Sequence, residues 1–117
     1  MKFIAVFFLS FVFTLNASAQ HATTLATAPD ATQPVLKVRA ACGKCLFGMT
    51  ASECSLAVRI KGKTYFVDGA GIDDFGDAHA ADGFCNATCQ AEVQGKIEGG
   101  RFKATWFKLI PSKSKSN

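Results

Sequence analysis

The sequence predicts a small all-β domain, and three observations carry this prediction. Five segments alternate apolar and polar residues with a period of two, as strands with one buried face do. Short glycine-containing turns separate two pairs of neighbouring segments. One segment alone carries a helix signal, and it is short. We therefore expect a five-stranded sheet accompanied by a single helix.

The first three strands are expected in the first half of the domain. Residues 35–39 alternate apolar and charged side chains, and residues 56–61 repeat this pattern. A turn at residues 61–63, centred on Gly62, leads into a third alternating segment at residues 64–68. The second and third segments are thus expected to form a hairpin.

The helix and the last two strands are expected in the second half. Asp82 can cap a short helix over residues 83–90, because its side chain accepts free backbone N–H groups. Residues 92–98 and 101–110 alternate again, and Gly99-Gly100 between them suits a two-residue hairpin turn.

The predicted order β-β-β-α-β-β is that of an OB-fold, a small Greek-key barrel. Closure of a barrel also removes the open edges of a small sheet. The alternative is an open five-stranded α+β sheet. In the last segment the alternation slips between Trp106 and Phe107, which indicates a bulge or an end covered on both faces.

The N-terminus is typical of a cleaved signal peptide, residues 1–19. Lys2 precedes an apolar run at residues 3–15, and Ala17-Ser18-Ala19 forms an A-x-A cleavage pattern. The apolar run is shorter than the roughly 20 residues that cross a bilayer. We therefore expect a periplasmic or secreted protein with no stable membrane insertion after cleavage.

The mature chain divides into a spacer, a domain and a tail. Residues 20–34 are rich in Ala, Thr and Pro and predict a disordered spacer, and residues 111–117 predict a disordered tail. The domain is then residues 35–110. Loss of Lys2 lowers the formal net charge from +4 to +3, and no dense basic stripe is present, so a nucleic-acid partner is not expected.

The domain contains all five cysteines, in two groups that a barrel would bring to one end. In an oxidising compartment a small core favours structural disulfides. The pairing does not follow from the sequence. The disulfide candidates are Cys42, Cys45, Cys54 and Cys85.

Metal binding is the second interpretation of the cysteines. The C-x-x-C pair brings two sulfurs to one ion, and cysteines at i and i+4 of the predicted helix share one side. Either His79 or Cys54 can replace one ligand, and the donor set suits zinc or copper(I). The candidate ligands are Cys42, Cys45, Cys85, Cys89, His79 and Cys54.

The third interpretation is a thiol–disulfide oxidoreductase that uses Cys42 and Cys45. Such pairs are redox-active when the first sulfur lies at a helix N-terminus, but residues 46–49 begin a helix poorly. No other catalytic motif is visible. The sequence therefore favours a non-enzymatic binding or structural module, whose partner is a metal ligand or an unidentified protein.

One combined pattern resembles a known family. Residues 42–49 read C-G-K-C-L-F-G-M, residues 65–69 read Y-F-V-D-G, and residues 79–85 read H-A-A-D-G-F-C. Over residues 40–110 the chain resembles an uncharacterised family of small exported bacterial proteins, a domain of unknown function. The resemblance implies a bacterial, extracytoplasmic setting and brings no activity. Cys89 is not part of the pattern.

Overall fold

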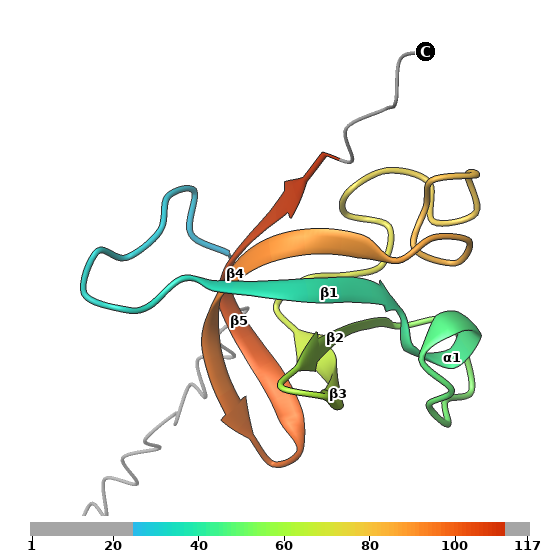
Figure 1. Ribbon diagram of the computed structural model, residues 1–117, viewed down its shortest axis with the longest axis horizontal. Helices are drawn as coiled ribbons and strands as arrows, with labels where there is room; N and C mark the ends of the chain where they lie inside the picture. Colours follow the sequence, from blue (N-terminus) through green and yellow to red (C-terminus); the bar gives the residue numbers. More distant parts are fainter. Residues whose placement is uncertain (1–24, 112–117) are drawn as a thin grey trace, which may run out of the picture.

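The computed structural model describes residues 25–111, and these residues form five strands and one short helix (Figure 1). The predicted signal peptide, residues 1–19, and residues 112–117 of the predicted tail lie outside this part. The described part of the chain has no helix with the length and apolar character that crossing a bilayer requires. The elements are β1 (Leu36–Cys42), α1 (Gly43–Leu46), β2 (Leu56–Ile60), β3 (Lys63–Asp68), β4 (Cys89–Glu98) and β5 (Arg101–Ile110).

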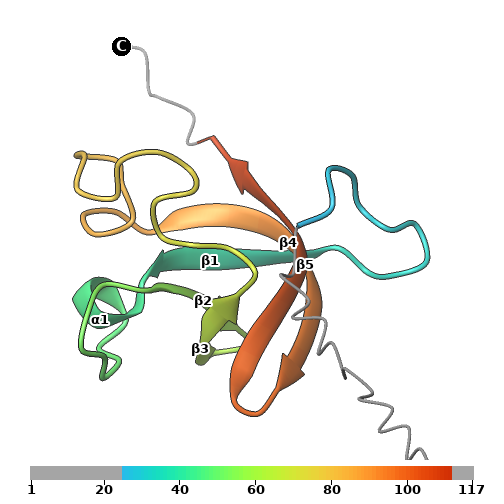
Figure 2. The ribbon, with the colours of Figure 1, turned by 180° about the vertical axis from the view of Figure 1, so that it is seen from behind.

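The five strands close into a barrel in the order β1-β2-β3-β5-β4, and β4 pairs back onto β1. Strands β3 and β5 are parallel, and every other neighbouring pair is antiparallel. The views from the two sides show how β4 and β5 curve around the barrel to complete it (Figures 1 and 2). The prediction of a small all-β barrel is confirmed, and closure excludes the open α+β sheet.

Both predicted hairpin turns are present. In the β2–β3 turn Lys61 has φ of 50° and Gly62 has φ of 81°, and in the β4–β5 turn Gly99 and Gly100 have φ of 60° and 74°. Two successive residues with positive φ produce the backbone twist that joins two right-twisted strands. Glycine adopts this conformation without a steric penalty, so the sequence marks both turns.

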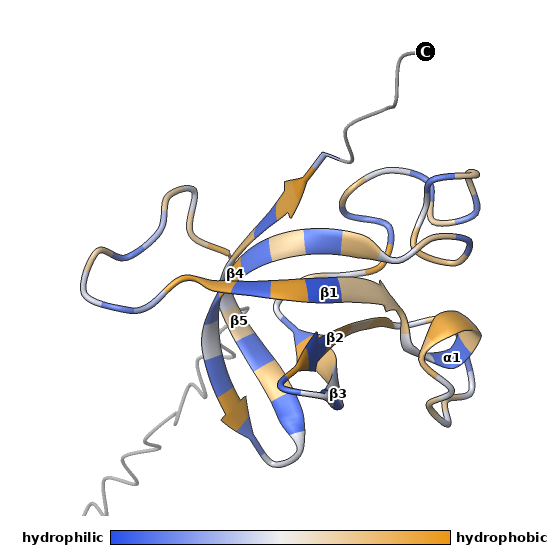
Figure 3. Cartoon of the chain, viewed as in Figure 1, coloured by the Kyte–Doolittle hydropathy of each residue, from blue (hydrophilic) through white to orange (hydrophobic). Residues whose placement is uncertain are grey.

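Alternating side chains fill the barrel interior, and the hydropathy pattern along the strands follows this alternation (Figure 3). Phe102 is the largest fully buried side chain. Burying one such apolar side chain contributes about 1.5–3 kcal/mol. The core cluster comprises Val38, Ala40, Leu56, Val58, Val67, Ala70, Phe84, Ala91, Val93, Phe102, Ala104 and Phe107.

A bulge in β5 explains the irregular pattern near its end. Gln94 pairs with Trp106 while Gly95 pairs with Ala104, so Thr105 has no partner in the ladder. The extra residue reverses the side-chain alternation. As a result Trp106 and the next residue, Phe107, are both 7 % exposed although they point to opposite faces.

The N-terminal segment before β1 covers the outer face of β4 and β5. The Gln94 side chain is 1 % exposed, and its Nε2 donates to the carbonyls of Asp30 (2.7 Å) and Gln33 (3.1 Å). Its Oε1 accepts the Asp30 N–H at 2.7 Å, and the Ala26 N–H donates to the Thr105 carbonyl at 2.8 Å. The sequence predicts a disordered spacer over residues 20–34, of which residues 20–24 lie outside the described part of the chain. Within the described part these bonds connect Ala26, Asp30 and Gln33 to the barrel.

The single helix lies in a different place from the predicted one. It is α1, directly after β1, whereas residues 83–86 form turns and β4 begins at Cys89. A side chain at Gly83 would place its Cβ 2.3 Å from the Asp77 carbonyl oxygen. Gly83 therefore lies at a close approach of two backbone segments, and its N–H donates to the Ala80 carbonyl at 2.9 Å. Local packing, which the sequence pattern does not reveal, decides the conformation of this segment.

Candidate metal centre

Four cysteines meet at one end of the barrel. Cys42 is the last residue of β1, Cys45 lies in α1, Cys54 precedes β2, and Cys85 lies in the long connection between β3 and β4. Their four Sγ atoms all lie within 4.8 Å of one another. We call these four residues the cysteine cluster. It joins segments that are more than 40 positions apart in the sequence.

The short helix α1 aims the first two sulfurs at each other. Cys42 is its N-cap residue, and its Sγ accepts the Cys45 N–H at 3.3 Å. At Gly43 an added Cβ would lie 2.7 Å from the Phe66 ring and 2.8 Å from the Met49 sulfur. The absence of a side chain at Gly43 therefore lets the helix pack tightly on β3.

Main-chain hydrogen bonds hold the contributing segments together. The Cys42 N–H donates to the Phe84 carbonyl, and the Gly43 N–H donates to the Ser55 carbonyl, both at 2.9 Å. The Cys85 N–H donates to the Ala78 carbonyl at 2.9 Å. Each bond involves a cysteine of the cluster or the residue beside one. Backbone hydrogen bonds thus connect three of the segments that carry the sulfurs.

The thiols of the cluster differ in exposure and in acidity. Cys42 is fully buried while Cys45 is exposed. Burial raises the pKa of Cys42, but hydrogen bonds from Cys45, Ser55 and Cys54 outweigh it and leave that pKa below the ordinary value. Hydrogen bonding to Cys42 and then to Cys54 raises the pKa of Cys45 to about 12. Burial first, and then a hydrogen bond with Cys54, raises the pKa of Cys85 to about 11.

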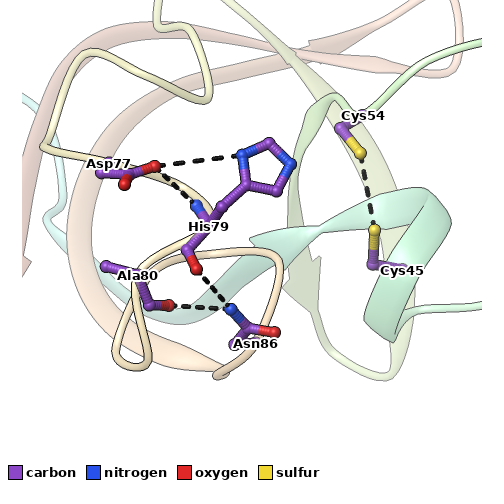
Figure 4. A network of polar contacts seen from close by, with 6 residues as sticks. All are labelled: Cys45, Cys54, Asp77, His79, Ala80 and Asn86. Atoms are coloured by element: carbon purple, nitrogen blue, oxygen red, sulfur yellow. Dashed lines mark hydrogen bonds and ion pairs between the residues drawn. The ribbon is translucent and has the colours of Figure 1, made fainter.

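The sulfur spacing fits a tetrahedral metal site. Four sulfurs placed about 2.3 Å from a zinc ion are separated by about 3.8 Å. The Cys45 and Cys54 Sγ atoms are 3.5 Å apart and face each other (Figure 4), and no pair in the cluster exceeds 4.8 Å. All five cysteines are free thiols in the structure, including the four disulfide candidates. The arrangement is therefore a group of four sulfurs that could hold one metal ion.

Cys89 lies apart from the cluster, although the sequence grouped it with Cys85. That grouping required a helix over residues 83–90, and Cys89 is instead the first residue of β4, paired with Ala40 of β1. Its thiol donates to the Asp82 carbonyl at 3.7 Å. Burial, followed by the charge of Asp82, raises the pKa of Cys89.

His79 also lies outside the cluster. Its side chain is 77 % exposed, and its Nδ1 lies 3.9 Å from the Asp77 Oδ1. The His79 N–H donates to the same carboxylate oxygen at 2.9 Å, and the Asn86 side chain donates to the His79 and Ala80 carbonyls (Figure 4). His79 is therefore part of a local network that shapes the loop before Cys85.

The four residues of the cluster are the same four that the sequence offers as disulfide candidates. Among the candidate metal ligands Cys54 is expected only as a substitute, and it is a full member because β1 and β2 pair up to Cys42 and Leu56 and bring the preceding loop beside α1. One further feature escapes sequence reasoning. Phe47 ends α1 and stacks beneath Arg59 of β2. The sequence signal for the contact between Phe47 and Arg59 is the aromatic residue two positions after the C-x-x-C motif.

Comparison with known proteins gives a family and no function. A family model described as "Family of unknown function (DUF6370)" matches residues 36–110, which span the whole barrel from β1 to β5. No curated protein and no solved structure matches the chain.

Proposed function

We propose that this chain, which belongs to the DUF6370 family of unknown function, is a metal-binding module whose cysteine cluster holds one soft metal ion. One observation carries the proposal: four Sγ atoms from separate segments lie within 4.8 Å of one another. Thiolates select zinc and copper(I), the two metals that the donor set suits. The protons of Cys45 and Cys85 would leave when the ion binds.

The composition of the site supports a structural or carrier role rather than catalysis. Zinc sites with four cysteine ligands are closed, whereas catalytic zinc sites keep one position for water or substrate. The cysteine cluster offers four sulfurs, and the Cys45 N–H donates to the Cys42 sulfur as a supporting contact. Such contacts orient the ligands and tune the metal. We infer a non-enzymatic module.

A second candidate is thiol–disulfide exchange through Cys42 and Cys45. The observation in its favour is that Cys42 is the N-cap of α1 and has a lowered pKa, although burial itself opposes this. An attacking thiolate must also reach its substrate. Cys42 is fully buried, so the exposed Cys45 is the thiol that a substrate would meet, and its pKa of about 12 makes it a poor nucleophile.

A metal titration tests the proposed function. The reduced protein should bind one equivalent of Zn²⁺, or of Cu⁺ in a parallel anaerobic titration, and Co²⁺ should give thiolate charge-transfer absorption. Cys45→Ser removes an exposed sulfur and should weaken Zn²⁺ binding at least tenfold, or by about 1.4 kcal/mol. Cys89→Ser is the matched control and should leave the affinity within twofold. Equal losses in both variants would show that the cysteine cluster is not the site.

We further propose that the module acts outside the cytoplasm, as a periplasmic or secreted protein. The support is the order of charge, apolar run and A-x-A pattern within residues 1–19. In an oxidising compartment a bound metal would also protect the four thiols from disulfide formation. The mature chain should begin at Gln20, as read by N-terminal sequencing of the exported fraction. Full-length protein confined to the cytosol would refute the proposal.

A further inference from the structure

A groove on the outer face of the barrel has no cysteine in its lining. It has a volume of about 260 Å³ and is formed by β1, β2 and the start of β4. The side chains of Lys37, Arg39, Arg59 and Gln90 are exposed. The lining residues are Lys37, Val38, Arg39, Arg59 and Gln90, so it contains three cationic side chains and no carboxylate.

Two arginines of this groove oppose each other directly. Arg39 of β1 and Arg59 of β2 are register partners in the antiparallel pair. Like charges at opposed positions destabilise a sheet, because the side chains start about 5 Å apart. In residues 25–111 the ion pairs involve other cations, and none neutralises either arginine. The fold therefore places two arginines side by side on one face without an ion pair to either, among the residues that the structure describes.

Arg59 is held in place without being neutralised. Its guanidinium carbon lies 4.7 Å from the centroid of the Phe47 ring. A cation over an aromatic face is attracted by the ring quadrupole, while the N–H groups at the guanidinium edge stay free to donate. The backbone of Phe47 is held by a hydrogen bond from its N–H to the Gly43 carbonyl at 3.2 Å. The groove thus holds one pre-positioned guanidinium beside a second one.

We propose that this groove binds a small oxyanion, a phosphate or carboxylate group, between Arg39 and Arg59. Guanidinium groups match both anions because they donate two parallel hydrogen bonds. The Gln90 amide adds a neutral donor at the same groove. A bound anion would also remove the repulsion between the two arginines.

The neighbouring charges favour a small ligand over a long polyanion. Glu92 of β4 is the register partner of Lys37 on one side and of Lys108 on the other. This carboxylate interrupts the positive surface beyond the groove. A nucleic acid needs an extended basic track, and the outer face of β4 does not provide one.

The test is a titration of the full mature protein followed by NMR of the arginine Nε–H signals. The probes are inorganic phosphate and succinate, with sodium chloride at matched ionic strength as the reference. Saturable shifts should occur with phosphate or succinate and not with chloride, and the better probe identifies the anion class. Arg39→Gln and Arg59→Gln should each weaken that binding at least tenfold.

Lys103→Gln provides the matched control, because Lys103 is an exposed cation on β5. It should change the dissociation constant less than twofold. Arg39→Gln should not lower the melting temperature, since it removes a like-charge pair, so its loss of binding would not reflect unfolding. Shifts that are identical with chloride, or an equal loss in Lys103→Gln, would overturn the proposal and indicate a diffuse positive potential only.

Discussion

Removing the metal from the reduced, zinc-loaded protein should lower its melting temperature by at least about 15 °C. A ligand that binds only the folded state at 1,000 times its dissociation constant stabilises that state by about 4 kcal/mol. For a domain of this size, each kcal/mol corresponds to about 4–8 °C. The effect is large because the cysteine cluster joins the end of β1 to the connection before β4, and the unfolded chain has no such site.

Differential scanning calorimetry with a chelator, with a reductant and with both measures this effect. A metal protein loses stability with the chelator alone, whereas a disulfide-stapled protein loses it with the reductant alone. Cys45→Ser should abolish most of the response to the chelator, and Cys89→Ser should retain it. An unchanged melting temperature under chelator would show that no metal contributes to the fold.

Gly83→Ala should weaken zinc binding at least tenfold while the barrel persists. The new Cβ would lie 2.3 Å from the Asp77 carbonyl oxygen and 2.5 Å from that of Ala78. Both neighbours are backbone atoms, so the loop itself must move, at a cost of about 1–3 kcal/mol. The Ala78 carbonyl accepts the Cys85 N–H, and therefore Cys85 moves with the loop. One ligand is then misplaced.

Gly76→Ala in the same loop is the matched control. Gly76 has φ of 113°, but an added Cβ would have no atom within 4 Å. The substitution should cost about 1–3 kcal/mol of backbone strain and change zinc affinity less than twofold. Isothermal titration calorimetry gives the affinities, and circular dichroism checks the barrel. Equal affinities for Gly83→Ala and the parent protein would mean that the loop does not position Cys85.

The strands were predictable from the sequence because their signals are local. Period-two alternation marks each strand, and glycine at positive φ marks both hairpin turns. The helix was misplaced for the opposite reason. Asp82 followed by Gly83 suits a cap, yet the close backbone approach at Gly83 is a tertiary contact. The packing of the segment before β1 could not be predicted either. It depends on the buried Gln94 side chain, and nothing in the sequence marks this residue as buried.

The sequence predicted that cysteine sulfurs would form the site, but it did not settle which of the five cysteines take part. The C-x-x-C motif identifies Cys42 and Cys45, and a barrel predicts that the two groups of cysteines approach one another. The exclusion of Cys89 depends on its place in β4. The pairing of β1 with β2 places Cys54, and the bond from the Cys42 N–H to the Phe84 carbonyl places Cys85. Both are long-range contacts.

Intact mass spectrometry with thiol alkylation tests the metal-binding proposal most directly. The purified protein is measured under native conditions, and again after alkylation with and without a chelator. The proposal predicts the mass of one metal ion, with Cys42, Cys45, Cys54 and Cys85 protected until the chelator is added and Cys89 reactive throughout. A metal-free mass with all five thiols reacting alike, or a mass lowered by two hydrogens for each disulfide, would contradict it.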